Sequence, residues 1–161
     1  QMNISGNVEA DRGTVDARHF SNSGVINLTN ANVRADTVKI AALGNNGVLS
    51  VGGGSISADT TLQLYASNGN GQVVFVGNVN LNGASTKSIA GDSVTINNGV
   101  LVNVTGPAAS VYVNNNVEGQ PKANYTGFGG NGQTTGTFTG SGANPPQLLS
   151  NAPPLGAPPG G

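Results

Sequence analysis

The stretch Asn22-Ser23-Gly24-Val25-Ile26-Asn27-Leu28 decides the fold, because similar stretches return along the chain. The other copies are Asn45-Asn46-Gly47-Val48-Leu49-Ser50-Val51, Asn97-Asn98-Gly99-Val100-Leu101-Val102 and the degenerate Asn70-Gly71-Gln72-Val73-Val74-Phe75-Val76. Gly24, Gly47 and Gly71 take the same place in three of these copies and are almost evenly spaced. Their spacing falls in the range of roughly 20 to 25 residues that is typical of one coil of a solenoid.

A second block recurs between these copies, and its members share a small residue followed by aspartate. The copies are Val33–Ile40, Ile56–Leu64 and Ile89–Ile96. Within one period the apolar residues alternate with polar ones, as in the pairs Ile26/Leu28 and Val38/Ile40. Alternation with a period of two is typical of β-strands and not of helices. The pattern therefore predicts three short strands in each coil.

Such short strands cannot bury their apolar faces alone, so we expect the coils to stack about 4.8 Å apart with equivalent strands paired in parallel. The predicted fold is all-β, a right-handed parallel β-helix (β-solenoid) of about 23–24 residues and three short strands per coil. Equivalent positions should form columns inside it. The expected columns are Ile26 with Leu49 and Val74, Ile40 with Leu64 and Ile96, and Ala35 with Ala58 and Gly91.

The repeats divide the chain into two parts, with residues 1–116 forming the β-solenoid and residues 117–161 a Gly/Asn/Thr/Pro-rich linker or tail. Six of the eight prolines lie from Pro145 onward, where they block sheet ladders. Within the solenoid, residues 78–87 are predicted to be an insertion that projects as a loop, the best place for a specific contact. Three aromatic residues of the tail are candidates to pack over the open end of the solenoid: Tyr125, Phe128 and Phe138.

Composition excludes several classes of function. Charged residues make up 8% of the chain and the formal net charge is −1, so we expect no nucleic-acid partner. Hydrophobic residues make up 36%, and no apolar run approaches the roughly 18 residues of a membrane helix, which predicts a soluble chain. Cysteine is absent, which excludes disulfides and thiolate metal sites.

The amino-terminal residues do not resemble a signal peptide. Gln1 is followed by polar Asn3, Ser5 and Asn7 instead of a basic segment and an apolar core. We expect either a mature product or a piece of a longer protein, and the linker-like tail favours the second.

The Asn-x-Gly-Val and hydrophobic-x-Ala-Asp blocks resemble the repeats of filamentous-haemagglutinin-type exoproteins, which are large two-partner-secretion-like bacterial adhesins. The resemblance covers about residues 4–116. It implies a right-handed parallel β-helix in a secreted or cell-surface protein. The amino-terminal secretion domain of that family is not recognisable in this chain, so export by an outer-membrane partner is an inference about a parent protein.

Three aspartates, Asp36, Asp59 and Asp92, are predicted to occupy the same position in successive coils. The favoured interpretation is that each caps a turn by accepting backbone N–H bonds. The alternative is a column of carboxylates with calcium between them. The stretch Gly52-Gly53-Gly54-Ser55-Ile56-Ser57 has the glycines of the calcium-binding nonapeptide but not its aspartate.

The remaining acids do not pair in the way that glycoside hydrolysis or lyase chemistry requires. One charged cluster is predicted near the amino terminus, where charge discourages edge-to-edge stacking. It comprises Glu9, Asp11, Arg12, Asp16 and Arg18. The single histidine, His19, is interpreted as structural. We therefore predict that the chain is not an enzyme and assign no catalytic, cofactor-binding or metal-ligating residue.

The favoured hypothesis is a structural or adhesin-like segment of an exported bacterial surface protein, a rigid scaffold that assembles end to end into a filament. The expected partners are a second copy, through coil ends or tail, and a surface glycan or protein. The alternative is a carbohydrate-binding or degenerate polysaccharide-lyase-type β-helix, with Tyr65, predicted to face solvent, Tyr112 and Tyr125 as candidates to stack on sugars. A trimeric fibre component is a third hypothesis.

Overall fold

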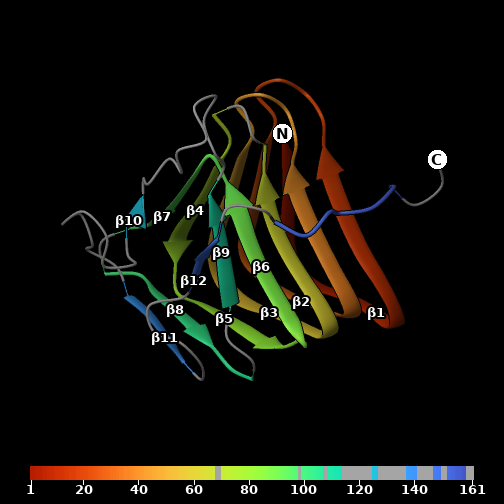
Figure 1. The fold of residues 1–161 in the computed structure, drawn as a ribbon. Helices are drawn as coiled ribbons and strands as arrows, with labels where there is room; N and C mark the ends of the chain where they lie inside the picture. Colours follow the sequence, from red (N-terminus) through yellow and green to blue (C-terminus); the bar gives the residue numbers. More distant parts are fainter. Residues whose placement is uncertain are drawn as a thin grey trace.

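The computed structural model describes residues 1–67, 70–97, 99–106, 109–113, 125–126, 137–140, 147–149 and 152–158. These residues form strands and connecting segments with no helix (Figure 1). The strands are β1 (Met2–His19), β2 (Val25–Ala42), β3 (Val48–Ala66), β4 (Gln72–Gly77), β5 (Val79–Gly83), β6 (Thr86–Gly91), β7 (Ser93–Ile96), β8 (Leu101–Val104), β9 (Ala109–Val113), β10 (Tyr125–Thr126), β11 (Thr137–Gly140) and β12 (Gln147–Leu149). Every pairing between them is parallel, which confirms the predicted all-β solenoid.

Each of the long strands β1, β2 and β3 makes one coil and bends at two corners (Figure 1). Each later coil consists of three separate strands. They are β4, β5 and β6 in one coil and β7, β8 and β9 in the next. The solenoid thus has three faces. The first contains β4 and β7, the second β5 and β8, and the third β6 and β9, each continued by the matching third of β1, β2 and β3.

The interior is filled by columns of apolar side chains at equivalent positions. Ile26 pairs with Leu49, and both are fully buried, as the repeats predict. The column then continues with Val73, not Val74, since Val73 points inward and is fully buried. The column of Ile40 and Leu64 continues with Ile89, and the column of Ala35 and Ala58 continues with Gly83. The predicted partners Ile96 and Gly91 are therefore wrong.

A short connection explains why the third copy of the second block, Ile89–Ile96, is misaligned. β1 and β2 are joined by residues 20–24, and β2 and β3 by residues 43–47, whereas Asp92 alone joins β6 to β7. Its backbone N–H donates to the carbonyl oxygen of Gly71 at 2.9 Å. The step along the chain from Val73 to its partner Val94 is consequently shorter than the step from Leu49 to Val73.

Residues 78–87 are not a projecting insertion. They contain β5 and the start of β6, which complete a coil of ordinary length. The copy of the first block that begins at Asn97 is also out of phase with the others. It precedes β8, whose Val102 pairs with Val79 on the second face, whereas the other copies precede the first face.

Ladders of asparagine side chains connect the coils on the outer surface. Asn27 Nδ2 donates to Asn3 Oδ1 at 3.0 Å on the first face. On the second face, Asn103 Nδ2 donates to Asn80 Oδ1 at 3.1 Å. Each amide both accepts and donates, so one residue type repeated at one position can link neighbouring coils.

The parallel ladder includes residues that the repeats assigned to the tail. β10 pairs with β7, β11 with β8 and β12 with β9. Tyr125 begins β10 and Phe138 lies in β11, while Phe128 lies outside the described residues. Farther along, residues 152–158 lie across the outside of the third face (Figure 1).

The corner at Gly54 tests how closely the coils are stacked. Gly54 has a φ of 86°, and an added Cβ would overlap the carbonyl oxygen of Ala31 in the coil beneath. We expect Gly54→Ala to lower the free energy of unfolding by at least about 2 kcal/mol, measured by urea denaturation. Gly6→Ala is the matched control, since Gly6 has a φ of 71° with open space around it. It should cost about 1 kcal/mol, and equal losses in the two variants would contradict the close stacking.

Candidate functional site

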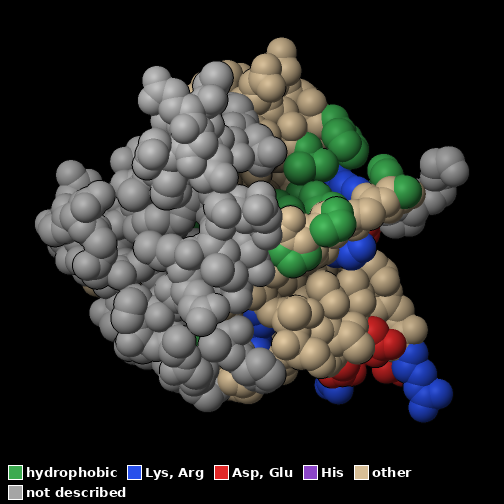
Figure 2. Space-filling view, in the orientation of Figure 1, with side chains coloured by type: hydrophobic (Ala, Val, Ile, Leu, Met, Phe, Trp, Pro, Cys, Tyr) green, Lys and Arg blue, Asp and Glu red, His purple; other side chains and the backbone are tan. Residues whose placement is uncertain are grey.

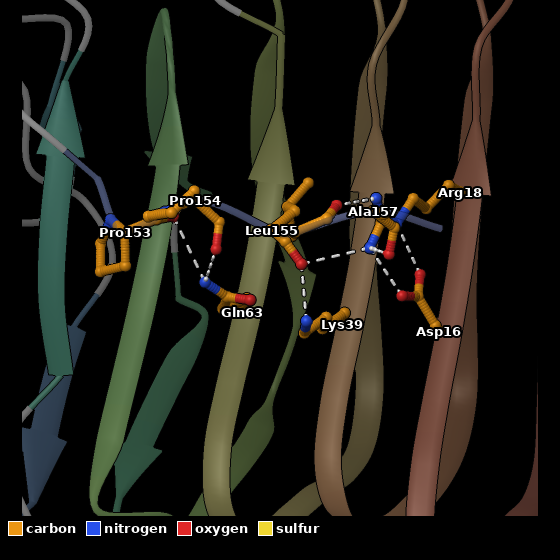
Figure 3. A network of polar contacts seen from close by, with 9 residues as sticks. Asp16, Arg18, Lys39, Gln63, Pro153, Pro154, Leu155 and Ala157 are labelled. Carbon is orange, nitrogen blue, oxygen red and sulfur yellow. Dashed lines mark hydrogen bonds and ion pairs between the residues drawn. The ribbon is translucent and has the colours of Figure 1, made fainter. Parts of the chain in front are cut away.

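The third face carries the most elaborate set of contacts in the described part of the chain. Residues 152–158, here called the C-terminal segment, cross β3, β2 and β1 on its outer side (Figure 3). Outward side chains of this face stand in register from coil to coil. One column contains Asp16, Lys39, Gln63 and Ser88, and the next contains Arg18, Ala41, Tyr65 and Ala90.

Tyr65 and Gln63 of β3 hold the start of the C-terminal segment. The Tyr65 hydroxyl donates to the carbonyl oxygen of Pro153 at 2.7 Å. Gln63 Nε2 lies 3.3 Å from the Pro153 oxygen, 3.4 Å from the Pro154 oxygen and 3.2 Å from the Tyr65 hydroxyl oxygen. The Tyr65 bond is the short one and hence the strongest of this group.

Lys39 and Arg18 hold the rest of the segment. Lys39 Nζ donates to the carbonyl oxygen of Leu155 at 2.6 Å. Arg18 donates to the carbonyl oxygens of Gly156 at 2.8 Å, Leu155 at 3.3 Å and Ala157 at 3.4 Å. We call Arg18, Lys39, Gln63 and Tyr65 the donor track, since all four donate to backbone carbonyls of the segment.

Asp16 fixes the position of Arg18. Arg18 Nε donates to Asp16 Oδ1 and Nη2 to Asp16 Oδ2, both at 2.7 Å, a bidentate pair. The Arg18 side chain is only 6% exposed and the Asp16 side chain 3%, so the pair is largely shielded from solvent. A planar guanidinium fixed on one edge presents its remaining N–H groups in a defined direction. Here that direction is the C-terminal segment (Figure 3).

An apolar patch lies beside the donor track. Ala41, Tyr65 and Ala90 are buried side by side on the outer side of the third face, and Leu43, Ala152 and Leu155 pack against them. Figure 2 shows hydrophobic side chains gathered where the segment crosses the sheet, with Lys and Arg side chains next to them. The segment is thus held by apolar contact as well as by hydrogen bonds.

A groove of about 340 Å³ runs between the C-terminal segment and the sheet. Six of its lining residues are polar, Thr37, Lys39, Thr61, Gln63, Thr86 and Ser88, and the other two are Pro153 and Pro154. Gln63 is 3% exposed, and its Oε1 atom has no hydrogen-bond partner in the described part of the chain. A buried acceptor of this kind favours a donor group arriving from outside the chain.

Two of the three aspartates predicted to share one position do share it, and the third does not. Asp36 and Asp59 lie at the corner between the second and third faces, with Asp11 at the same corner of β1. Asp92 lies at a different corner, between the third and first faces, which corrects the prediction. Threonine hydroxyls make hydrogen bonds at the Asp36 corner, where Thr60 Oγ1 donates to the Asp36 carbonyl at 2.8 Å. Among the described residues, no three His, Cys, Asp or Glu side chains gather as a potential metal site.

The predicted amino-terminal charge cluster divides into two groups. Asp16 and Arg18 form the ion pair on the third face, whereas Glu9, Asp11 and Arg12 lie elsewhere on β1. His19 ends β1, and its Nδ1 lies 3.3 Å from both the backbone nitrogen and the hydroxyl of Ser21. His19 thus contacts the connection that follows β1.

The prediction that Tyr65 faces solvent is wrong. Its side chain points outward from the core, as its position in the strand requires, but the C-terminal segment covers it and leaves 6% exposed. The alternation of residues in β3 gave the direction of the side chain correctly. Alternation within a strand cannot predict that a distant segment covers this side chain, and Pro153 and Tyr65 are 88 residues apart.

Lys87 is a buried residue that the repeats did not reveal. It occupies the inward column of Val38 and Leu62 and is 1% exposed. Desolvation by burial lowers the pKa of its amine. The repeats missed it because residues 78–87 were interpreted as a loop, in which an inward position has no meaning.

The comparisons with known proteins give no relative. No protein family, curated protein or solved structure that we compared with the chain matches it. No helix in the described ranges is long and apolar enough to span a membrane.

The lowered pKa of Lys87 makes a prediction about pH. Between its folded pKa and the ordinary value of 10.5, the unfolded chain binds more protons at this residue than the folded chain. Stability should therefore rise with pH through that window. We expect the free energy of unfolding of the wild type, measured relative to Lys87→Met by urea denaturation, to be higher at pH 10 than at pH 7. Lys87→Arg, which stays charged, should show no such gain, and a wild-type difference independent of pH would refute the account.

Proposed function

We propose that this chain is a non-catalytic structural segment of an exported bacterial surface protein, in which the β-solenoid serves as a rigid, adhesin-like scaffold. The observation that carries the proposal is the parallel pairing of coils on all three faces. Each coil is bonded to its neighbours on every face, with register shifts confined to a few positions such as the corners, so bending the rod requires many bonds to stretch together. A rod of this construction suits a spacer that holds other parts of a protein away from a cell.

Export and a surface location are supported by the repeats, which resemble those of filamentous-haemagglutinin-type exoproteins. Adhesion in this proposal means contact with a surface glycan or protein along the outer faces of the rod.

End-to-end assembly is the second part of the proposal. Among the described strands β1 pairs only with β2, so its other edge offers unpaired N–H and C=O groups. Several hydrophobic residues of that coil are half-buried where their equivalents in the next coils are fully buried. They are Met2, Ile4, Val8, Ala10 and Val15. A further coil from a second copy fits this edge.

Carbohydrate binding is the alternative, and the groove beside the C-terminal segment favours it. Its lining of hydroxyl, amide and ammonium groups offers the donors and acceptors that sugars bind, and Gln63 Oε1 is an unused acceptor within the described part of the chain. This candidate concerns binding only, without turnover.

Electron microscopy of the purified chain tests the scaffold. We expect stiff particles of constant width that lengthen into fibres as protein concentration rises, because the β1 edge accepts another coil. Val76→Lys is the control and should assemble as the wild type does, since Val76 is 46% exposed on β4, away from the β1 edge. Flexible particles of variable shape would refute the rigid scaffold, and a discrete trimer in sedimentation would favour the fibre-component hypothesis.

An enzymatic assay tests the non-catalytic part separately. We expect no turnover of uronate-containing polysaccharides. Turnover that Asp11→Asn or Asp16→Asn abolishes would overturn the proposal, and reproducible binding on a glycan array without turnover would support the carbohydrate-binding alternative.

A further inference from the structure

The C-terminal segment and the donor track are complementary in hydrogen bonding. Pro153, Pro154 and Pro158 have no backbone N–H, so the segment presents mainly carbonyl acceptors. The donor track presents hydroxyl, amide, ammonium and guanidinium donors to those carbonyls. When a proline-rich peptide binds this face, few hydrogen-bonding groups of the peptide or of the face are left without a partner, so proline-rich peptides are the ligand class that suits it best.

The contacts also follow the coils in order. β3 binds the carbonyl of Pro153, β2 that of Leu155, and β1 makes its shortest bond to that of Gly156, so the segment advances one or two residues per coil. One or two residues of a polyproline II helix rise about 3 to 6 Å, a range that includes the roughly 4.8 Å between neighbouring strands. An extended proline-rich chain therefore presents a carbonyl to each coil in turn.

Side-chain recognition comes from Leu155. Its side chain packs against the patch of Ala41, Tyr65 and Ala90. An aromatic ring with a hydrogen-bonding tip beside an apolar patch is the arrangement by which proteins bind proline-rich peptides. The sequence Pro153-Pro154-Leu155-Gly156 supplies both the rigid carbonyls and the apolar anchor.

We propose that the third face is a binding site for proline-rich extended peptides, and that the C-terminal segment of a second copy of this chain competes for it with the chain's own segment. Every contact to the segment uses its backbone carbonyls or its apolar side chains, which any copy presents identically. The chain's own segment acts at an effective concentration of about millimolar, so it normally occupies the site. The inference does not depend on the scaffold function, because it concerns only the third face and the segment.

Peptide binding to the full chain tests the site. In the Leu155→Lys chain, the new ammonium group meets Lys39 and Arg18 and leaves the apolar patch, which frees the face. A fluorescent peptide of residues 151–161 should bind this variant saturably, at least tenfold more tightly than it binds the wild type. Adding Tyr65→Phe, which removes the bond to Pro153, should weaken binding about fivefold.

Two controls keep the test decisive. Val76→Lys adds the same charge at an exposed position on the first face and should leave peptide affinity as in the wild type. If Leu155→Lys impairs folding, as judged by circular dichroism, Leu155→Gly replaces it. Absence of saturable binding to either Leu155 variant, or equal binding of a peptide that carries Lys at position 155, would overturn the proposal.

Mixing two full-length variants identifies the second copy as the competitor. The Leu155→Lys chain has a free face, and the Tyr65→Ala chain has a free segment. At concentrations below those at which fibres form, we expect a one-to-one complex in sedimentation velocity when they are mixed and none for either alone. If the peptide binds but the mixture stays monomeric, exchange between copies is refuted.

Discussion

In-register parallel pairing between successive coils is the constraint on which the rest of the structure depends. Once a coil is stacked on its neighbour, each position acquires a direction, inward or outward, and a partner above and below it. The inward columns of Ile26 and Ile40 then become a continuous core, and outward asparagines become ladders. The donor track of the third face also results from this stacking. Its members lie in two neighbouring outward columns, Lys39 and Gln63 in one and Arg18 and Tyr65 in the other.

The sequence was informative wherever the repeat was regular. The columns of Ile26 with Leu49 and of Ile40 with Leu64 follow from a constant period and from alternation within strands. The prediction failed after residue 71, because the connection between coils is reduced to Asp92 and the Asn-Asn-Gly signature moves to another corner. A repeat in the sequence indicates that similar turns recur along the chain. The register of the strands depends instead on the number of residues between successive turns.

The site shows a different limit of sequence reasoning. Alternation placed Tyr65 outside the core, and the Pro-Pro pairs identified a segment that cannot join a sheet. Neither pattern reveals that the two meet, since the contact joins residues 88 positions apart and uses backbone carbonyls that every residue has. Once the register of the strands is known, however, the column of hydrogen-bond donors on the third face can be recognised, and it indicates a place where a proline-rich segment can bind.

The register itself is tested most directly by disulfide cross-linking, which is clean because the chain has no cysteine. Val74 and Thr95 point outward on the first face and pair across neighbouring coils, whereas the repeat alignment placed Thr95 beside Gln63. Paired Cα atoms about 4.8 Å apart suit a disulfide. The account predicts rapid cross-linking of Val74→Cys/Thr95→Cys and none of Gln63→Cys/Thr95→Cys under mild oxidation, and the reverse result would contradict it.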